Sequence, residues 1–204
     1  MCDAIVSALL KASRVVVFTG AGVSAESGIA TFREKQNGFW SQYNPMELAS
    51  PEGWEEDKCR VWAWYEARRA NTLAAQPNPG HLAIAQLQEA LEAATGHPVI
   101  VEVVTQNIDN LHERAGSLNV SHLHGSLFSP RCSKCGEPGL FDSHMPDVDC
   151  QSVEPPKCSV CGDSIRPGIV WFGESLPTSV FESAKQSARD CDVMLVVGTS
   201  ARTL

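Results

Sequence analysis

Four of the eight cysteines in this chain of 204 residues form two close pairs. Cys132 and Cys135 make one C-x-x-C motif, and Cys158 and Cys161 make a second one further along the chain. Two such pairs are typical of tetrahedral thiolate coordination of zinc, in which four protein ligands leave no open position for water. Disulfide bonds and a redox-active pair are the alternatives. Because no secretion signal precedes the motifs, we expect a reducing compartment and one structural zinc ion.

A glycine-rich turn follows the β-branched run at residues 14–18. It satisfies the pattern G-x-G-x-x-G/A with Gly20, Ala21, Gly22, Val23, Ser24 and Ala25. Glycines let backbone N–H groups approach a pyrophosphate, and the N-terminus of the following helix stabilises its charge. A tight turn without a ligand is the alternative for an isolated match. Since no acidic residue follows where a dehydrogenase binds ribose, the pattern predicts a dinucleotide site but not an ordinary dehydrogenase.

Two further strand-like segments are each followed by polar residues. Asn107 and Asp109 follow the β-branched run at 99–104, and His124 follows a shorter one. A histidine at a strand end suits a general base, because its pKa lies near working pH. The alternatives are structural: a satisfied side chain for His124, as for His122 nearby, and a helix-capping turn for Asn107 and Asp109.

Taken together, these motifs closely resemble those of the sirtuin family. The matching blocks follow the family's order and cover nearly the whole chain: residues 20–33, residues 105–109, His124 with Gly125, the two cysteine pairs, residues 166–174 and residues 198–200. The resemblance implies an NAD-dependent protein-lysine deacylase that releases nicotinamide and O-acyl-ADP-ribose. Its implied partners are acyl-lysine proteins, and its implied cofactors are NAD and one zinc ion.

The resemblance also implies roles for individual residues. His124 is the implied general base, which deprotonates a ribose hydroxyl after the acyl-lysine carbonyl has displaced nicotinamide. Asn107 and Asp109 are the other implied catalytic residues, and they position the nicotinamide and ribose. The implied cofactor-binding residues are Gly20, Ala21, Gly22, Ser24, Ala25, Thr31, Phe32, Arg33, Gln106, Asn107, Ile108, Asp109, Gly198, Thr199 and Ser200. The four paired cysteines are the implied metal ligands, and they take no part in the chemistry.

One short segment resembles the place where a sirtuin's substrate peptide adds as an extra strand. It consists of Val170, Trp171, Phe172, Gly173 and Glu174. Backbone pairing of this kind tolerates many flanking sequences. The alternative is a core strand that ends in a turn.

Tyr65 and Arg68 lie three residues apart on an expected helix and therefore share one face. A phenol and a guanidinium together can bind a carboxylate at the far end of an acyl chain. Sirtuins that remove succinyl, malonyl and glutaryl groups carry this Tyr-x-x-Arg pair, and Thr31 before Phe32 also resembles that branch. The alternatives are a packed tyrosine with a solvated arginine, or a general deacetylase.

Strand-like and helix-like segments alternate along the chain. We expect strands at 14–18, 99–104, 120–123, 168–172 and 193–197, and helices at 1–10, 57–73, 81–94 and 178–189. This order predicts an α/β fold, with a Rossmann-like parallel sheet, helices on both faces and a small inserted zinc-ribbon and helical domain. The expected units are a Rossmann-like domain of residues 1–33, 80–129 and 166–204, a helical module of residues 34–79 with no steady period in its first part, and a zinc-binding module of residues 130–165.

Composition excludes several other classes of function. The net charge of −8 argues against a zinc-ribbon protein that binds nucleic acid, and no apolar run is long enough to span a membrane. We expect an intracellular protein, mitochondrial, cytoplasmic or nuclear, although no transit peptide is evident. Sirtuins continue beyond the counterpart of residues 198–200 with further strands and a closing helix. Because this chain ends at Leu204, we expect an incomplete adenosine pocket and, as an alternative function, a protein with little or no activity.

Overall fold

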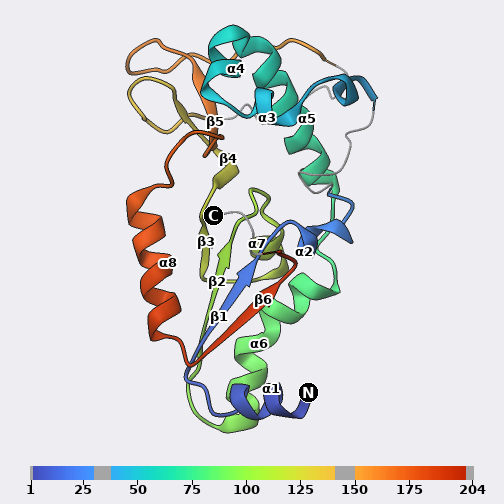
Figure 1. The fold of residues 1–204 in the computed structure, drawn as a ribbon, viewed down its shortest axis with the longest axis vertical. Coiled ribbons are helices and arrows are strands. Elements are labelled where there is room, and N and C mark those ends of the chain that lie inside the picture. Colours follow the sequence, from blue (N-terminus) through green and yellow to red (C-terminus); the bar gives the residue numbers. More distant parts are fainter. Residues whose placement is uncertain (1, 30–37, 141–149, 201–204) are drawn as a thin grey trace.

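The computed structural model describes residues 2–29, 38–140 and 150–200, and its largest sheet has four parallel strands. These strands are β1 (Arg14–Thr19), β2 (Ile100–Thr105), β3 (Val120–His122) and β6 (Val193–Val197). They are arranged in the order β3-β2-β1-β6 (Figure 1). The α/β fold with a parallel sheet, predicted from the sequence, is confirmed.

Helices cover both faces of this sheet, as expected. The flanking helices are α1 (Cys2–Leu9), α6 (Pro79–Thr95) and α8 (Thr178–Asp190). Val15 and Val17 of β1 pack into one apolar cluster with Ile84 of α6. Val16 points to the opposite face and packs with Ala184 of α8. A strand buried on both faces has a continuous apolar sequence, and Figure 1 shows α6 and α8 on opposite sides of β1.

A second sheet consists of two antiparallel strands, β4 (Gly125–Cys132) and β5 (Ile165–Ile169). The prediction of a strand at 168–172 in the parallel sheet is wrong, because the observed strand ends at Ile169 and pairs with β4. The expected sheet did not include β4 either. Its pairing is irregular between Ser126 and Arg131, so no clean alternation marks it in the sequence.

Short capped helices fill most of the described residues between 38 and 57. They are η1 (Gly38–Gln42), α3 (Pro45–Leu48) and α4 (Pro51–Glu56), and the longer α5 (Lys58–Ala74) follows them. Side chains of Asn44, Ser50 and Asp57 accept backbone N–H bonds at the starts of α3, α4 and α5. Such caps stabilise helices that are too short to show a period, which is why the sequence suggested an irregular segment.

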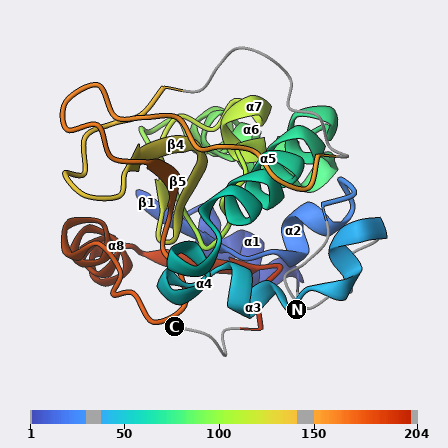
Figure 2. The same cartoon turned by 90° about the horizontal axis from the view of Figure 1, so that it is seen from above.

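One apolar cluster joins these helices to the two-stranded sheet. Trp54 and Trp64, from α4 and α5, pack in it with Leu127 of β4 and Ile165 of β5. Figure 2, seen from above, shows α5 beside β4 and β5. The predicted boundaries of the helical and zinc-binding modules stay predictions, but the two modules share this core.

The carboxyl ends of three parallel strands meet at one edge of the main sheet. Thr19 of β1 is paired with Thr105 of β2, and Thr105 with His122 of β3. The short helices α2 (Gly22–Ala25) and α7 (Leu111–Ala115) follow β1 and β2 here. In open parallel sheets this edge is where ligands bind, and it carries the glycine turn and His124. Among the described helices, none has the length and apolar character needed to cross a bilayer.

Candidate active site and metal centre

The glycine turn after β1 packs directly against the end of β6. Gly22 N donates to Gly198 O at 2.8 Å, and Gly20 N donates to Val197 O at 3.2 Å. A Cβ at Gly20 would lie 2.6 Å from Thr199 Cβ, and a Cβ at Gly22 would lie 2.7 Å from Gly198 O. Close packing of two loops therefore requires these glycines, whether or not a ligand also approaches them.

Ser24, in α2, connects this turn to the two polar residues after β2. Its hydroxyl donates to Asp109 Oδ2 at 2.9 Å and accepts from Asn107 Nδ2 at 3.0 Å. All three side chains are buried. The second Asp109 oxygen, Oδ1, accepts from Leu111 N at 3.0 Å, so Asp109 also binds the first backbone N–H of α7.

His81, which the sequence did not single out, extends this network. Its Nδ1 accepts from Asn78 N at 3.3 Å, so its proton is on Nε2, which lies 3.4 Å from Ser24 Oγ. Burial lowers the pKa of His81, although Asp109 opposes this. The result is a directional chain of donors from Asn78 through His81 and Ser24 to Asp109. Only the Asn-Pro start of α6 signalled part of it in the sequence.

A second buried network supports the loop after β2. Thr19 Oγ1 donates to Thr105 Oγ1 at 2.8 Å, and Asn107 N donates to the same Thr105 oxygen at 3.0 Å. His112 Nε2 lies 3.0 Å from Thr19 Oγ1, and its ring meets that of His81 edge-on at 4.9 Å. Burial, together with His81, lowers the pKa of His112 to about 4. Thr105 belongs to the sirtuin-like block 105–109, but nothing in the sequence indicated Thr19 or His112, since ordinary strand and helix positions carry them.

His124 lies beside this network with a defined ring orientation. Its Nδ1 is 2.8 Å from the carbonyl oxygen of Gln106, which can only accept, so Nδ1 carries the proton. Nε2 then has a free lone pair. The Gln106 side chain accepts at 2.9 Å from Thr199 Oγ1, which brings these two predicted cofactor residues together.

His122 has a structural environment, as the sequence suggested. Its Nδ1 lies 2.8 Å from Asn107 O, and its Nε2 lies 2.6 Å from Glu113 Oε1. Burial opposes a charge on this ring, but the Glu113 carboxylate and the Asn107 carbonyl outweigh it and raise the pKa of His122.

The predicted substrate segment is a tightly held turn after β5. Arg166 binds both oxygens of Glu174, at 2.6 and 2.9 Å, and Glu174 Oε2 also accepts from Trp171 N at 2.8 Å. Val170 N donates to His124 O, and Phe172 N donates to Ala49 O, both at 2.9 Å. The backbone N–H groups of residues 170–172 are therefore occupied within the chain. Gly173 has a φ of +87°, which glycine adopts readily.

Tyr65 and Arg68 share one face of α5, but their partners differ. Trp171 Nε1 donates to Tyr65 Oη at 3.0 Å, and burial raises the pKa of Tyr65. The Arg68 guanidinium lies 5.0 Å from the centre of the Trp64 ring, and within the described residues no carboxylate pairs with it. Burial lowers its pKa, against the effect of Tyr65. Its neighbour Arg69 is already paired with Glu66, at 2.6 Å.

The four paired cysteines come together at the far end of β4. Their Sγ atoms all lie within 4.8 Å of one another. Cys132 Sγ is 3.4 Å from Cys161 Sγ, and Cys135 Sγ is 3.6 Å from Cys158 Sγ. The backbone N–H of Cys135 is the main cause that lowers the pKa of the Cys132 thiol to about 6. This cluster is suited to one structural zinc ion, as predicted.

The remaining predicted residues divide into two groups. Ala21, Ala25 and Ser200 are exposed, and Ile108 is half-buried, with its carbonyl accepting from Leu127 N. Thr31, Phe32 and Arg33 lie outside the described residues.

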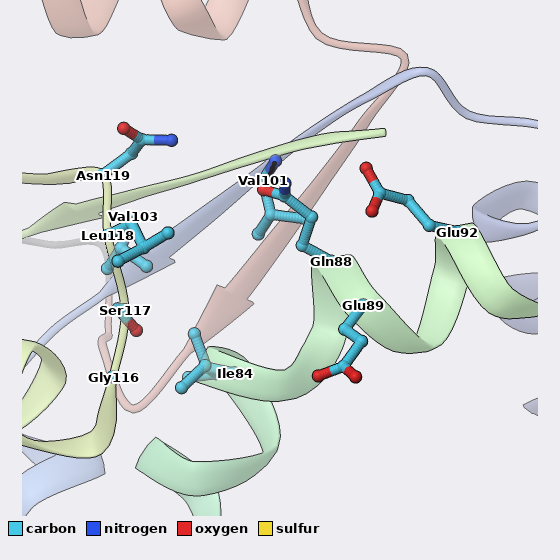
Figure 3. Close-up of a pocket in the computed structure, with 11 residues that line it drawn as sticks. Ile84, Gln88, Glu89, Glu92, Val101, Val103, Gly116, Ser117, Leu118 and Asn119 are labelled. Atoms are coloured by element: carbon cyan, nitrogen blue, oxygen red, sulfur yellow. Dashed lines mark hydrogen bonds between the residues drawn. The ribbon is translucent and has the colours of Figure 1, made fainter. Parts of the chain in front are cut away.

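Two cavities lie outside the network around Ser24 and Asp109, and one of them borders the residues next to His124. One of about 260 Å³ is bounded by α6, β2 and the loop before β3 (Figure 3). Its polar side chains support the fold, since Gln88 accepts from Val101 N and Glu92 from Val99 N. The other, of about 500 Å³, lies between β3, β4, β5 and α8 and includes His122 and Ser126. Neither contains His124 or Asp109.

Comparisons with known proteins identify the family of this chain. The family described as "Sir2 family" matches residues 20–204. The chain is 49% identical over 201 residues to an NAD-dependent protein deacylase of Methylococcus capsulatus, covering 98% of this chain and 76% of the relative. It is 50% identical over 200 residues to NAD-dependent protein deacylase 1 of Pseudomonas aeruginosa, covering 97% and 77%. A solved Sir2 homologue in complex with NAD superposes with a TM-score of 0.84 at 43% identity, covering 98% of this chain and 73% of that one. The chain therefore belongs to the Sir2 family, the sirtuins.

Proposed function

We propose that this protein is an NAD-dependent protein-lysine deacylase that prefers acyl groups ending in a carboxylate. The observation that carries the proposal is the network of Ser24, Asn107 and Asp109 beside His124, at the carboxyl edge of the parallel sheet. The relatives described above are named NAD-dependent protein deacylases, which supports the reaction type.

The residues at this edge fit a nicotinamide dinucleotide. Asn107 donates through Nδ2 to Ser24, while within the described residues its Oδ1 accepts no hydrogen bond, so an acceptor remains for a ligand amide. Asp109 would lie near the ribose, and the turn at Gly20 to Ser24 near the pyrophosphate. Bound NAD supplies an electrophilic ribose carbon with nicotinamide as its leaving group.

His124 is suited to act as a general base in this site. Because Nδ1 donates to the Gln106 carbonyl, Nε2 is the atom that takes a proton. The carbonyl keeps the ring oriented and stabilises the imidazolium once it forms. By contrast, both nitrogens of His122 are engaged, which supports assigning the base to His124.

Two unsatisfied donors support the preference for acidic acyl groups. Tyr65 Oη accepts from Trp171, so its own proton is available, and in the described part of the chain nothing accepts it. Arg68 has only donors and no carboxylate partner among the described residues. A succinyl, malonyl or glutaryl carboxylate can accept from both.

The backbone of residues 170–174 supports a specific mode of peptide binding. The N–H groups of Val170, Trp171 and Phe172 are used within the chain. A substrate strand would therefore pair mainly through the carbonyl oxygens of this segment, with its own N–H groups as donors.

One experiment tests the whole proposal. Peptides of one sequence, carrying succinyl-, malonyl-, glutaryl- or acetyl-lysine, are incubated with and without NAD and analysed by mass spectrometry. We expect NAD-dependent removal of the acidic groups, faster than removal of acetyl, together with O-acyl-ADP-ribose. Faster removal of acetyl would show a general deacetylase instead, and no product from any peptide would refute deacylation.

A further inference from the structure

Trp171 lies in the turn after β5 and packs against helix α5, where it contacts Tyr65 in two ways. Its indole Nε1 donates to Tyr65 Oη at 3.0 Å, and the two rings are stacked with centroids 6.5 Å apart. Trp171 is 2% exposed and Tyr65 4%. The bond is therefore shielded from water, which would otherwise compete for both groups.

The chemistry of the two groups fixes the direction of this bond. An indole N–H only donates, whereas a phenol has one proton and two lone pairs. Tyr65 must therefore accept from Trp171, and its single proton is left to donate elsewhere. In the described parts of the chain no acceptor takes that proton. A carboxylate only accepts, so it complements a tyrosine held in this state.

Trp171 itself cannot easily turn away from Tyr65. The Arg166 guanidinium lies 3.3 Å from the centre of its ring and is held by both oxygens of Glu174. Glu174 also accepts from the Trp171 backbone N–H. On another side, the Trp54 ring lies 5.7 Å away. These contacts hold the indole in one rotamer and so keep its N–H directed at Tyr65.

We propose that Trp171 is a positioning residue for acyl selectivity, which fixes Tyr65 as a hydrogen-bond donor toward a carboxylate on the acyl chain. The role rests on the acidic-acyl preference proposed above. It differs from direct substrate binding, because Trp171 acts through Tyr65.

The test compares kcat/KM for succinyl-lysine and acetyl-lysine peptides of identical sequence. Trp171→Phe keeps an aromatic ring but removes the N–H, and we expect the succinyl-to-acetyl ratio to fall roughly fivefold, as for a hydrogen bond of ordinary net strength. The ratio does not depend on the fraction of folded enzyme, so partial unfolding does not obscure it. Trp54→Phe is the matched control, because phenylalanine keeps an aromatic ring beside Trp171. It also removes a buried indole N–H, but that N–H has no partner in the described residues, so the ratio should stay unchanged.

Two further variants show whether Trp171 acts through Tyr65. Tyr65→Phe should lower the ratio at least as much as Trp171→Phe, and adding Trp171→Phe to it should cause no further fall. If Trp171→Phe does not fold, retention of the ratio in Tyr65→Phe alone overturns the inference.

The outcomes separate this inference from the proposed function. A wild-type enzyme that does not favour succinyl overturns both. A wild-type succinyl preference that survives Trp171→Phe overturns the role of Trp171 only. So does a succinyl-to-acetyl ratio that Trp171→Phe lowers by the same factor in the wild type and in Tyr65→Phe.

Discussion

Ser24 Oγ lies 2.9 Å from Asp109 Oδ2, a hydrogen bond between residues 85 positions apart in the chain. It joins the turn after β1 to the loop after β2, so it holds the two parts of the candidate NAD site in a fixed position relative to each other. Ser24→Ala removes the donor to a buried carboxylate and also the acceptor of Asn107 Nδ2. We expect kcat/KM for NAD to fall roughly 10- to 100-fold, as for loss of a charged hydrogen bond. Steady-state kinetics with varied NAD measures this. Ser27→Ala is the control, because among the described residues the Ser27 hydroxyl bonds Asn78 and neither Asn107 nor Asp109. Equal effects of the two variants would contradict a specific role of Ser24.

The prediction for His124 follows from its orientation. His124→Ala removes Nε2, and we expect deacylation to fall by at least roughly 100-fold, while NAD still binds. Turnover is measured by mass spectrometry and NAD affinity by calorimetry. A variant that keeps wild-type turnover would show that another group is the base.

Elements with a strong local signal were predictable from the sequence. Helices α5, α6 and α8 were expected within a few residues of their observed ends. The spacing of apolar residues and the helix-breaking segment at 76–80 are both local features, so they can be seen in the sequence. The four cysteines were predictable for the same reason, since the motif spacing itself prescribes the geometry.

Contacts between distant segments were not predictable in this way. Nothing local marks His81 as the partner of Ser24, and β4 became a strand only through its pairing with β5. The fit of Gly22 against Gly198 likewise depends on two strands that meet only in the folded sheet. The sequence indicated the residues that we expect to carry chemistry, but not those that position them.

The zinc prediction has an internal control. Cys158→Ser should release the metal and lower the thermal stability of the protein, because metal binding contributes directly to folding here. Cys150→Ser should do neither, since the Cys150 thiol bonds Ser152 O outside the cluster. Zinc content by elemental analysis and a thermal melt report both effects. Full zinc content in Cys158→Ser would refute the assignment.

Arg68 and Arg69 form a matched pair for testing acyl preference. Arg68→Met should reduce desuccinylation by roughly 2–5 kcal/mol in transition-state stabilisation and spare deacetylation, because only succinyl leaves a carboxylate unpaired. Arg69→Met breaks the buried bond to Glu66 and should lower stability while changing both activities equally. Equal losses from Arg68→Met on the two peptides would indicate a structural arginine instead.

The buried histidines predict a loss of stability in mild acid. The pKa of His112 is about 4 in the folded protein, below its ordinary value of 6.5. Between these two pH values the unfolded chain binds a proton that the folded chain does not. The free energy of unfolding therefore falls as the pH falls, by about 3 kcal/mol over the whole range from 6.5 to 4.

Urea unfolding between about pH 7.5 and 4.5 tests this, with His112→Gln expected to show a flatter dependence. His122 has the opposite sign: its raised pKa adds stability at low pH, which is lost as pH rises through that pKa. An unchanged slope in His112→Gln would assign the acid sensitivity to other groups.

Strand β4 has consequences for how the length of this chain can vary. It begins directly after His124 and ends at Cys132, so one span of eight residues joins the proposed base to one of the four clustered cysteines. Adding or deleting a single residue would shift Cys132 out of its register with Ile165 of β5. Gly125 restricts the start of β4 in another way, since a Cβ added by substitution would lie 2.1 Å from Gly168 O. Length changes should therefore be poorly tolerated within β4.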